Sequence, residues 1–320
     1  SLTTAALFDK VRLAGAQARL FLMERAAAHW KVPVSQLKTD AGYVKHSSSN
    51  KKMSYGKLVS LSRKGDKIPL VKKSDLKKSN QYKLIGKNIP RVDIPVKVDG
   101  TAEFGIDVVV PGMVHASIIR APMHGATVKN FQNDNKGEIA QAIKLIKLPY
   151  GVAVLGKDLE TVLNARKNIQ VNWNFPKTGQ KYSSQEALKK YSKISEDKKV
   201  PGVTWWQPFF PKAIKGKKGY LQSALDDPKL KKLSSTYLTE HTYHGQMEPM
   251  NATASVDQSG KKAEIWAPTQ AVSVTTFAAA GVLKTSPQNI KVNTTFLGGG
   301  FGRRAQVDYI VDAVLLSKIT

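Results

Sequence analysis

Near its carboxyl end the chain reads Phe296-Leu297-Gly298-Gly299-Gly300-Phe301-Gly302-Arg303-Arg304, with four glycines among five consecutive residues. A segment rich in β-branched residues, 290–295, precedes this glycine loop, and a segment of mixed acidic and apolar residues, 307–316, follows it. The order predicts a strand, a loop and a helix. Because glycine lacks Cβ and tolerates positive φ, a ligand can approach the loop's backbone N–H groups and the positive end of the helix. We therefore predict that the loop holds an anion.

The loop does not match the two common phosphate-binding patterns. No Gly-Lys-Ser/Thr closes it, as a Walker loop requires. Gly298, Gly300 and Gly302 give G-x-G-x-G rather than G-x-G-x-x-G, and no acidic residue lies about 20 positions later within the chain. A tight turn with a purely structural role stays open as an alternative.

Composition describes a basic globular protein. The chain has 320 residues, of which 41% are hydrophobic, and 50 Lys+Arg against 24 Asp+Glu give a formal charge of +26. A net positive charge of this size would attract nucleic acid, an anionic membrane surface or an acidic partner. The lysines cluster in two hydrophilic stretches, 64–87 and 189–232, with few aromatic residues between them to stack on bases. We therefore expect a solvated surface and no nucleic acid.

Cysteine is absent from the chain, which excludes disulfides, thiolate metal sites and an iron–sulfur cluster held by this chain. No apolar run reaches the ~18 residues needed to cross a bilayer, and the N-terminus has no signal-peptide pattern. Both ends have the features of cut ends. Ser1 has no preceding Met, and Thr320 ends the chain inside an amphipathic helical pattern.

Local patterns divide the chain into three parts. A helical pattern over 5–30 and a basic linker predict an N-terminal helical segment, 1–85, as part of a cofactor domain. In 86–178 we expect strands at 104–110, 113–120, 150–155 and 171–173 and helices at 138–146 and 159–169. In 179–320 we expect strands at 235–244, 251–256 and 262–266 and a helix at 270–282. Mixed strands and helices of this kind predict an α+β fold.

Several separate motifs follow one another along the chain. They are Arg91-x-Asp93-x-Pro95-x-Lys97-x-x-Gly100, Phe104-Gly105-Ile106-Asp107, Pro111-Gly112-Met113, Arg120-Ala121-Pro122, Gln246-Met247-Glu248-Pro249-Met250-Asn251-Ala252-Thr253-Ala254, Trp266-Ala267-Pro268-Thr269-Gln270 and Gly298-Gly299-Gly300-Phe301-Gly302-Arg303-Arg304. Taken in this order, the motifs resemble the large subunits of molybdenum hydroxylases, the xanthine oxidase and aldehyde oxidase superfamily. Within it the chain resembles the isoquinoline 1-oxidoreductase β-subunit group, which includes molybdopterin-dependent aldehyde dehydrogenase large subunits. The helix ending in Ala26-Ala27-Ala28-x-Trp30-x-Val32 also fits that group.

The resemblance implies a fold, an activity and a cofactor. Residues 86–178 would form the α/β hammerhead domain, and 179–320 would form part of the molybdopterin-binding α+β domain, incomplete at its C-terminus. Such bacterial enzymes carry molybdenum on a pterin, commonly molybdopterin cytosine dinucleotide. They hydroxylate an N-heterocycle or oxidise an aldehyde with oxygen from water.

The resemblance also implies site residues. Gln270 matches the glutamine that hydrogen-bonds an oxygen on the metal, and the glycines match the loop around the pterin and its diphosphate. Arg303 can add a charge-assisted contact. No side chain is predicted as a metal ligand, and Glu248 stays open between a site carboxylate and a structural one. The predicted cofactor-binding residues are Gln270, Gly299, Gly300, Phe301, Gly302 and Arg303.

Other parts of the enzyme are expected outside this chain. In the family the general-base glutamate lies far beyond the glycine loop, so we expect it beyond Thr320, in the remaining portion of the large subunit. This chain alone would be inactive. Electrons would leave through a small [2Fe–2S] subunit, in agreement with the absence of cysteine. Arg303-Arg304-Ala305 differs from the Gly-Lys-Glu ending of the xanthine-oxidising branch, which disfavours purines as substrates.

Two alternative hypotheses stay open. The chain can be a basic anion-binding module for nucleic acid or an anionic membrane, in which the glycine loop is only structural. It can also be a non-catalytic relative of the enzymes. Export signals in relatives favour the periplasm or cell envelope over the cytoplasm, and membrane association would run through a partner.

Overall fold

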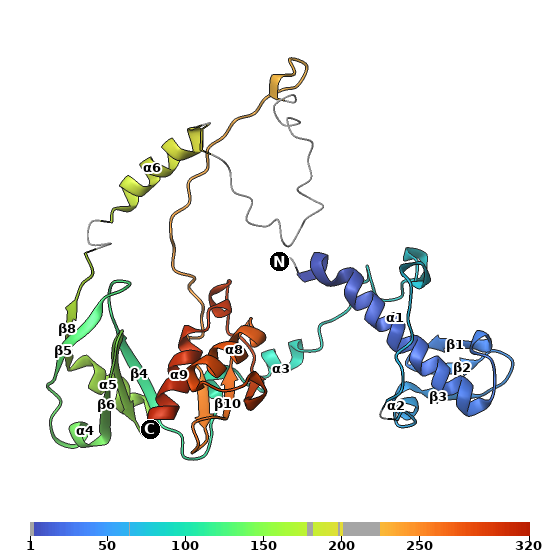
Figure 1. The fold of residues 1–320 in the computed structure, drawn as a ribbon, viewed down its shortest axis with the longest axis horizontal. Coiled ribbons are helices and arrows are strands. Elements are labelled where there is room, and N and C mark those ends of the chain that lie inside the picture. Colours follow the sequence, from blue (N-terminus) through green and yellow to red (C-terminus); the bar gives the residue numbers. More distant parts are fainter. Residues whose placement is uncertain (1–2, 64, 178–181, 198, 201–224) are drawn as a thin grey trace. The chain divides into compact units, whose positions relative to one another are not determined.

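The computed structural model describes residues 3–63, 65–177, 182–197, 199–200 and 225–320 (Figure 1). It divides into two compact units, 1–100 and 101–320. Much of the second lysine-rich stretch, 201–224, lies outside the described residues. None of the described helices is long and apolar enough to span a membrane.

Unit 1 is built on one long helix and a small sheet. Helix α1 covers Thr3–Trp30, close to the predicted 5–30. It is followed by the antiparallel strands β1 (Leu37–Asp40), β2 (Tyr43–His46) and β3 (Lys52–Ser54) and by the short helices α2 (Tyr55–Val59) and α3 (Ile94–Val98). The last turns of α1 pack on the sheet because their apolar side chains recur on one side. The buried core consists of Leu22, Ala26, Ala27, Leu37, Val44, Met53 and Leu58.

The first part of unit 2 contains two antiparallel sheets. Strand β7 (Gly151–Gly156) lies between β4 (His115–Arg120) and β6 (Ile143–Leu148), and β5 (Thr127–Asn133) pairs with β8 (Ile169–Asn174). Helix α4 covers Gly137–Ala142, and α5 (Leu159–Lys167) contributes Val162 and Ala165 to the core between these elements. Every residue of β7 is buried, as expected for a central strand covered on both faces. Helix α6 covers Ser184–Glu196.

The last part of unit 2 carries the glycine loop. Strand β10 (Ala263–Ala267) pairs antiparallel with β9 (Thr253–Val256) and parallel with β11 (Ile290–Thr294). Helix α8 (Val272–Leu283) connects the two parallel strands, and α9 (Asp308–Ile319) follows the loop. Both helices bury apolar residues against this sheet, among them Leu283, Ile310 and Val314. The loop therefore leaves the carboxyl end of a parallel strand, where α/β units commonly bind ligands.

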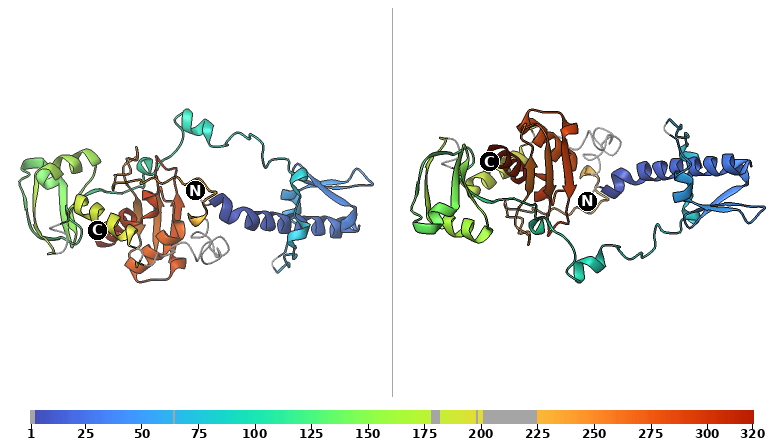
Figure 2. Two further views of the ribbon diagram at one scale, coloured as in Figure 1. Left: turned by 90° about the horizontal axis from the view of Figure 1, so that it is seen from above. Right: turned by 90° about the horizontal axis from the view of Figure 1, so that it is seen from below.

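Helix α9 also joins the two parts of unit 2. Leu316 packs with Leu148, Ala153 and Leu155 of the first sheet. In Figure 1 and in both views of Figure 2 the C-terminal end of α9 lies beside that sheet. Because α9 contributes apolar side chains to both hydrophobic cores, it packs the two parts of unit 2 together.

The structure confirms the predicted α+β class, in which helices and sheets intermix without a barrel among the described residues. The contact division falls after Gly100, so residues 86–100 belong to unit 1, while both later predicted domains lie in unit 2. The assignment of 1–85, 86–178 and 179–320 as separate domains stays a prediction.

Several predicted elements are wrong. Residues 104–110 are not a strand, because the Asp107 carboxylate accepts the Phe104 N–H (2.9 Å) and closes a 3₁₀ turn over Gly105–Asp107. Residues 143–146 belong to β6 instead of a helix, because they pair antiparallel with the buried strand β7, from Ile143 opposite Gly156 to Ile146 opposite Ala153. Residues 235–244 are exposed and form no strand. Strand β5 was not predicted.

Candidate functional site

The glycine loop turns twice through the left-handed backbone region. Gly299 and Gly302 have φ of +93° and +94°, values that residues with a Cβ rarely adopt. Phe301 lies between them with φ +49°, an uncommon conformation for a bulky residue. Strain of this kind persists only where the surroundings fix it and is frequent at ligand sites.

Four consecutive backbone N–H groups of the loop, those of residues 299–302, make no hydrogen bond to any described part of the chain. Phe301 and Gly302 are exposed, and Gly299 and Gly300 are half-buried. Successive free N–H groups in such a turn form a concave donor surface that favours anionic oxygens. A 3₁₀ turn over Arg303–Ala305 lies between the loop and α9, which begins at Asp308, and the contact of a ligand with the positive end of that helix stays a prediction.

Glu248 holds the start of the loop. Its backbone N–H donates to the Gly298 carbonyl (3.0 Å), and its carboxylate accepts the Gly298 N–H (2.9 Å). A Cβ on Gly298 would lie 2.3 Å from the Glu248 Cβ, so only glycine fits at this position. The two segments are thereby joined by close backbone contact, 50 residues apart in the sequence.

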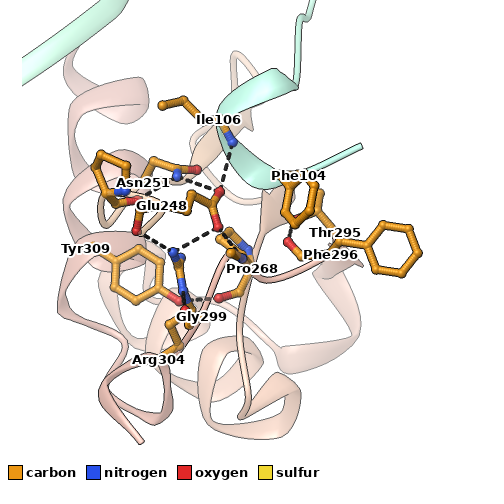
Figure 3. A network of polar contacts seen from close by, with 12 residues as sticks. Phe104, Ile106, Glu248, Asn251, Pro268, Thr295, Phe296, Gly299, Arg304 and Tyr309 are labelled. Atoms are coloured by element: carbon orange, nitrogen blue, oxygen red, sulfur yellow. Dashed lines mark hydrogen bonds and ion pairs between the residues drawn. The ribbon is translucent and has the colours of Figure 1, made fainter. Parts of the chain in front are cut away.

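Arg304 completes this support from below the loop (Figure 3). Its side chain is fully buried; Nε donates to the Gly299 carbonyl (2.7 Å), and Nη2 donates to both the carbonyl and the carboxylate of Glu248 (2.8 Å each). An ion pair removed from water depends on further hydrogen bonds, which here involve Nε and Nη2 of Arg304 and both carboxylate oxygens of Glu248. The carboxylate of Glu248 is therefore buried beside the loop and supports it, and its membership of the site stays a prediction.

Residues 104–107 reach the same carboxylate from the first part of unit 2. The Ile106 N–H donates to Glu248 Oε1 (3.1 Å), as does the Asn251 side-chain amide (2.9 Å). The ring centroids of Phe104 and Phe296 lie 6.0 Å apart. A Cβ on Gly105 would lie 2.5 Å from the Pro268 ring, so this contact also requires glycine. Motifs that are distant in the sequence thus meet around Glu248 (Figure 3).

Gln270 lies against the loop. Its backbone N–H donates to the Arg304 carbonyl (3.1 Å), and the Thr269 hydroxyl donates to the same oxygen (3.3 Å). A Cβ on Gly300 would lie 2.8 Å from Gln270 Oε1. The Gln270 side chain is exposed and makes no hydrogen bond to the described residues, so its amide can interact with a ligand at the loop.

Arg303 and Phe301 are placed differently from the glycines. Both Nη atoms of Arg303 donate to the Asp308 carboxylate (2.8 Å each), and this hydrogen-bonded pair lowers the pKa of Asp308. The Phe301 side chain is 74% exposed, beside the free N–H groups. The loop thus brings Gln270 together with Gly299, Gly300, Phe301 and Gly302, whereas the Arg303 guanidinium is turned toward α9. The role of each of them in binding stays a prediction.

Arg304 and Gln246 are two further candidates in this region that were not predicted from the sequence. Arg304 follows another arginine, and no local pattern distinguishes the buried member of the pair. Gln246 and Glu248 are 8% and 7% exposed, with Met247 at 93% between them. Side chains two apart on an extended segment share a face, so an alternating polar pattern around Glu248 was the available signal.

The residues of the loop fit a group that carries several oxygens. The N–H groups that make no hydrogen bond to the described residues can donate to acceptors on a ligand. A Cβ on Gly298 would collide with Glu248, and a Cβ on Gly300 would collide with Gln270. An oxo or phosphate group would satisfy donors of this kind.

Comparisons with known proteins point to the same group. Residues 208–319 match the model of the molybdopterin cofactor-binding domain. The β subunit of isoquinoline 1-oxidoreductase from Brevundimonas diminuta is 31% identical over 98% of this chain and 43% of its own length. A nicotinate dehydrogenase subunit from Pseudomonas putida is 25% identical over 96% of this chain and 25% of its own length.

A third relative is a membrane-bound aldehyde dehydrogenase (pyrroloquinoline-quinone) of Gluconacetobacter polyoxogenes, 26% identical over 97% of this chain and 40% of its own length. The chain spans less than half the length of each of these three relatives. Over nearly its full length, however, it aligns with subunits of oxidoreductases, one of them the β subunit of isoquinoline 1-oxidoreductase. The chain is therefore similar to the large subunits of such oxidoreductases, and residues 208–319 match the molybdopterin cofactor-binding domain.

Proposed function

We propose that the glycine loop and Gln270 form one wall of a molybdenum–pterin site in the large subunit of an oxidoreductase. The enzyme would hydroxylate an N-heterocycle or oxidise an aldehyde with oxygen from water. The observation that carries this proposal is the row of free N–H groups at 299–302, with the Gln270 amide against Gly300. The names of the relatives support the substrate classes, since they include an isoquinoline and a nicotinate enzyme.

The residues of this chain would bind and orient the cofactor. The N–H groups of 299–302 donate to oxygens of the bound group, and Gln270 supplies an amide that can donate or accept. Glu248 and Arg304 do not reach into the site but keep Gly298 and Gly299 in position. When bound, the molybdenum–pterin group supplies the redox chemistry and Lewis acidity that protein side chains lack.

The remaining components belong to other parts of the enzyme. We infer that the cofactor is the cytosine dinucleotide form and that electrons pass to a small [2Fe–2S] subunit, which agrees with a chain free of cysteine. The general-base glutamate would come from sequence beyond Thr320. The periplasm or cell envelope is the proposed location, with membrane association through a partner.

Elemental analysis tests the proposal. The full-length protein, produced together with the enzymes of molybdenum-cofactor synthesis, is expected to carry about one molybdenum per chain and to release a pterin and a cytidine nucleotide on denaturation. Gly300→Val is the matched variant, since its side chain would occupy the position of the Gln270 amide. A parent protein without molybdenum contradicts the proposal.

The same preparation distinguishes the two alternatives. A basic binding module would lack molybdenum and elute from DNA or anionic vesicles with a steep dependence on salt. A non-catalytic relative would retain the cofactor fold but lack the glutamate in its downstream sequence. In unit 1, the basic residues Lys73 and Lys83 form ion pairs with Asp9 and Asp40, which reduces the positive charge available to a polyanion.

A further inference from the structure

Gln246 buries a complete amide group without any partner among the described residues. Its side chain is 8% exposed, and neither Nε2 nor Oε1 makes a hydrogen bond in the described part of the chain. A buried polar group that loses its bonds to water costs about 1–3 kcal/mol when nothing replaces them. Natural structures contain few such groups, and they require an explanation.

The position of Gln246 connects it with the glycine loop. A Cβ on Gly299, the residue with φ +93°, would lie 3.5 Å from the Gln246 Cβ. Arg304 donates to the Gly299 carbonyl from its Nε, and its Nη1 is another buried atom without a partner in the described chain. Two side chains with unused polar atoms therefore border the same glycine, next to the free N–H groups of the loop.

The absent partner can be described by its chemistry. An anionic oxygen satisfies the Nε2 donor of an amide but leaves its Oε1 acceptor unused. Both atoms are satisfied together by a planar ring edge that carries a donor and an acceptor side by side. This conclusion holds whichever way the amide is oriented, because both of its polar atoms lack partners among the described residues.

We propose that the Gln246 side chain binds an amide-like edge of the pterin ring system, on the inner side of Gly299. The proposal rests on the proposed function, because the pterin is the ring of that kind which this site would hold. Gln246 then contributes to cofactor retention, and the cofactor-free protein bears the cost of the unpaired amide.

The variant Gln246→Met tests this assignment because methionine has a similar length and no polar hydrogen-bonding group. In the full-length protein we expect two opposite effects. Without cofactor, the melting temperature rises by about 1–2 °C, since the unpaired amide is gone. With cofactor, the dissociation constant rises about tenfold, measured as the molybdenum and pterin that remain bound after dilution and dialysis.

Gln132→Met is the matched control. Gln132 lies exposed on β5, and the same substitution there should change neither the melting temperature nor the cofactor content. A role of Gln246 in folding alone would lower the melting temperature of the cofactor-free variant and overturn the proposal.

The other outcomes are also decisive. A variant that retains molybdenum and pterin like the parent refutes the role of Gln246 while leaving the proposed function intact. If the Gln246→Met variant retains molybdenum and pterin like the parent but has a changed KM, Gln246 contacts the substrate and the proposed pterin contact is overturned. A parent protein that carries no molybdenum refutes the proposed function and this inference with it.

Discussion

Two arginine–carboxylate pairs in unit 2 differ in how completely their charges are satisfied. Glu248 receives hydrogen bonds from the Ile106 N–H, the Asn251 amide, the Gly298 N–H and Arg304, whose side chain is fully buried. The side chain of Asp312 on α9 receives, from the described residues, the Tyr150 hydroxyl (2.7 Å) and Arg120, whose side chain is 45% exposed. Both carboxylates connect the first part of unit 2 to the last, Glu248 through the Ile106 N–H and Asp312 through Arg120 and Tyr150.

The consequence for Asp312 is electrostatic. Burial raises the pKa of its carboxyl above the ordinary value, although Tyr150 and Arg120 act in the opposite direction. The ionised form is therefore disfavoured at this position in the folded protein. The Glu248–Arg304 pair fixes the geometry of the glycine loop, whereas the Asp312–Arg120 pair connects helix α9 to strand β4.

The largest expected effect comes from breaking the Glu248–Arg304 pair. Arg304→Met leaves the Glu248 carboxylate buried without its cation, and we expect a loss of about 3–5 kcal/mol in the free energy of unfolding. Denaturant unfolding measures the change. Adding Glu248→Gln should recover part of the loss, because no unpaired charge remains. A single variant within about 1 kcal/mol of the parent would show that the pair does not support the loop.

The glycines on the two sides of the loop should respond differently. Gly298→Ala places a Cβ 2.3 Å from the Glu248 Cβ, so we expect a loss of about 1–3 kcal/mol. Gly300→Ala meets only the end of the flexible Gln270 side chain, at 2.8 Å, and should change stability by less than ~1 kcal/mol while it reduces molybdenum content. Equal stability losses in the two variants would contradict this distinction.

Asp312→Asn tests the second pair through pH. The folded-state pKa of Asp312 is raised, so its ionised form costs stability above that pKa, and the cost disappears below the unfolded pKa of about 3.9. The asparagine variant should thus match the parent near pH 3 and exceed it by up to about 1 kcal/mol at pH 7. Urea unfolding at both pH values measures this. A variant that is less stable only at pH 7 would show that the ion pair outweighs burial.

Arg303→Gln should have the smallest effect on stability. Its partner Asp308 has a lowered folded pKa, so the pair stabilises the fold above the unfolded pKa and ceases to do so as pH falls through the folded value. Because Asp308 is 46% exposed, we expect a loss of no more than about 1 kcal/mol at pH 7 and none in strong acid. Thermal unfolding at the two pH values checks this. A loss like that of Arg304→Met would contradict the contrast between the neighbouring arginines.

Local patterns predicted much of the fold. The long helix α1, the strands β7 and β10 and the helices α5 and α8 follow from apolar periodicity and turn residues, and their observed bounds differ from the predicted ones by a few residues. One prediction was wrong because a polar contact, which the apolar pattern does not reveal, fixes the backbone conformation. At 104–107 a single carboxylate bond to an N–H group converts an expected strand into a turn.

The features of the candidate site likewise fall into those that the sequence predicted and those that only the tertiary structure revealed. The sequence by itself determined the glycine loop and the resemblance to molybdenum hydroxylase large subunits, because glycine content and motif order are properties of the chain that need no tertiary partner. Only the tertiary structure decided that Arg304 is buried and Arg303 is not, and that Gln246 holds an amide unpaired within the described chain beside Gly299. Adjacent arginines have the same intrinsic preferences, so their burial depends on where a carboxylate 56 residues away in the sequence is held. The free energy of a buried charge is set by such distant partners, and the sequence pattern around it does not contain them.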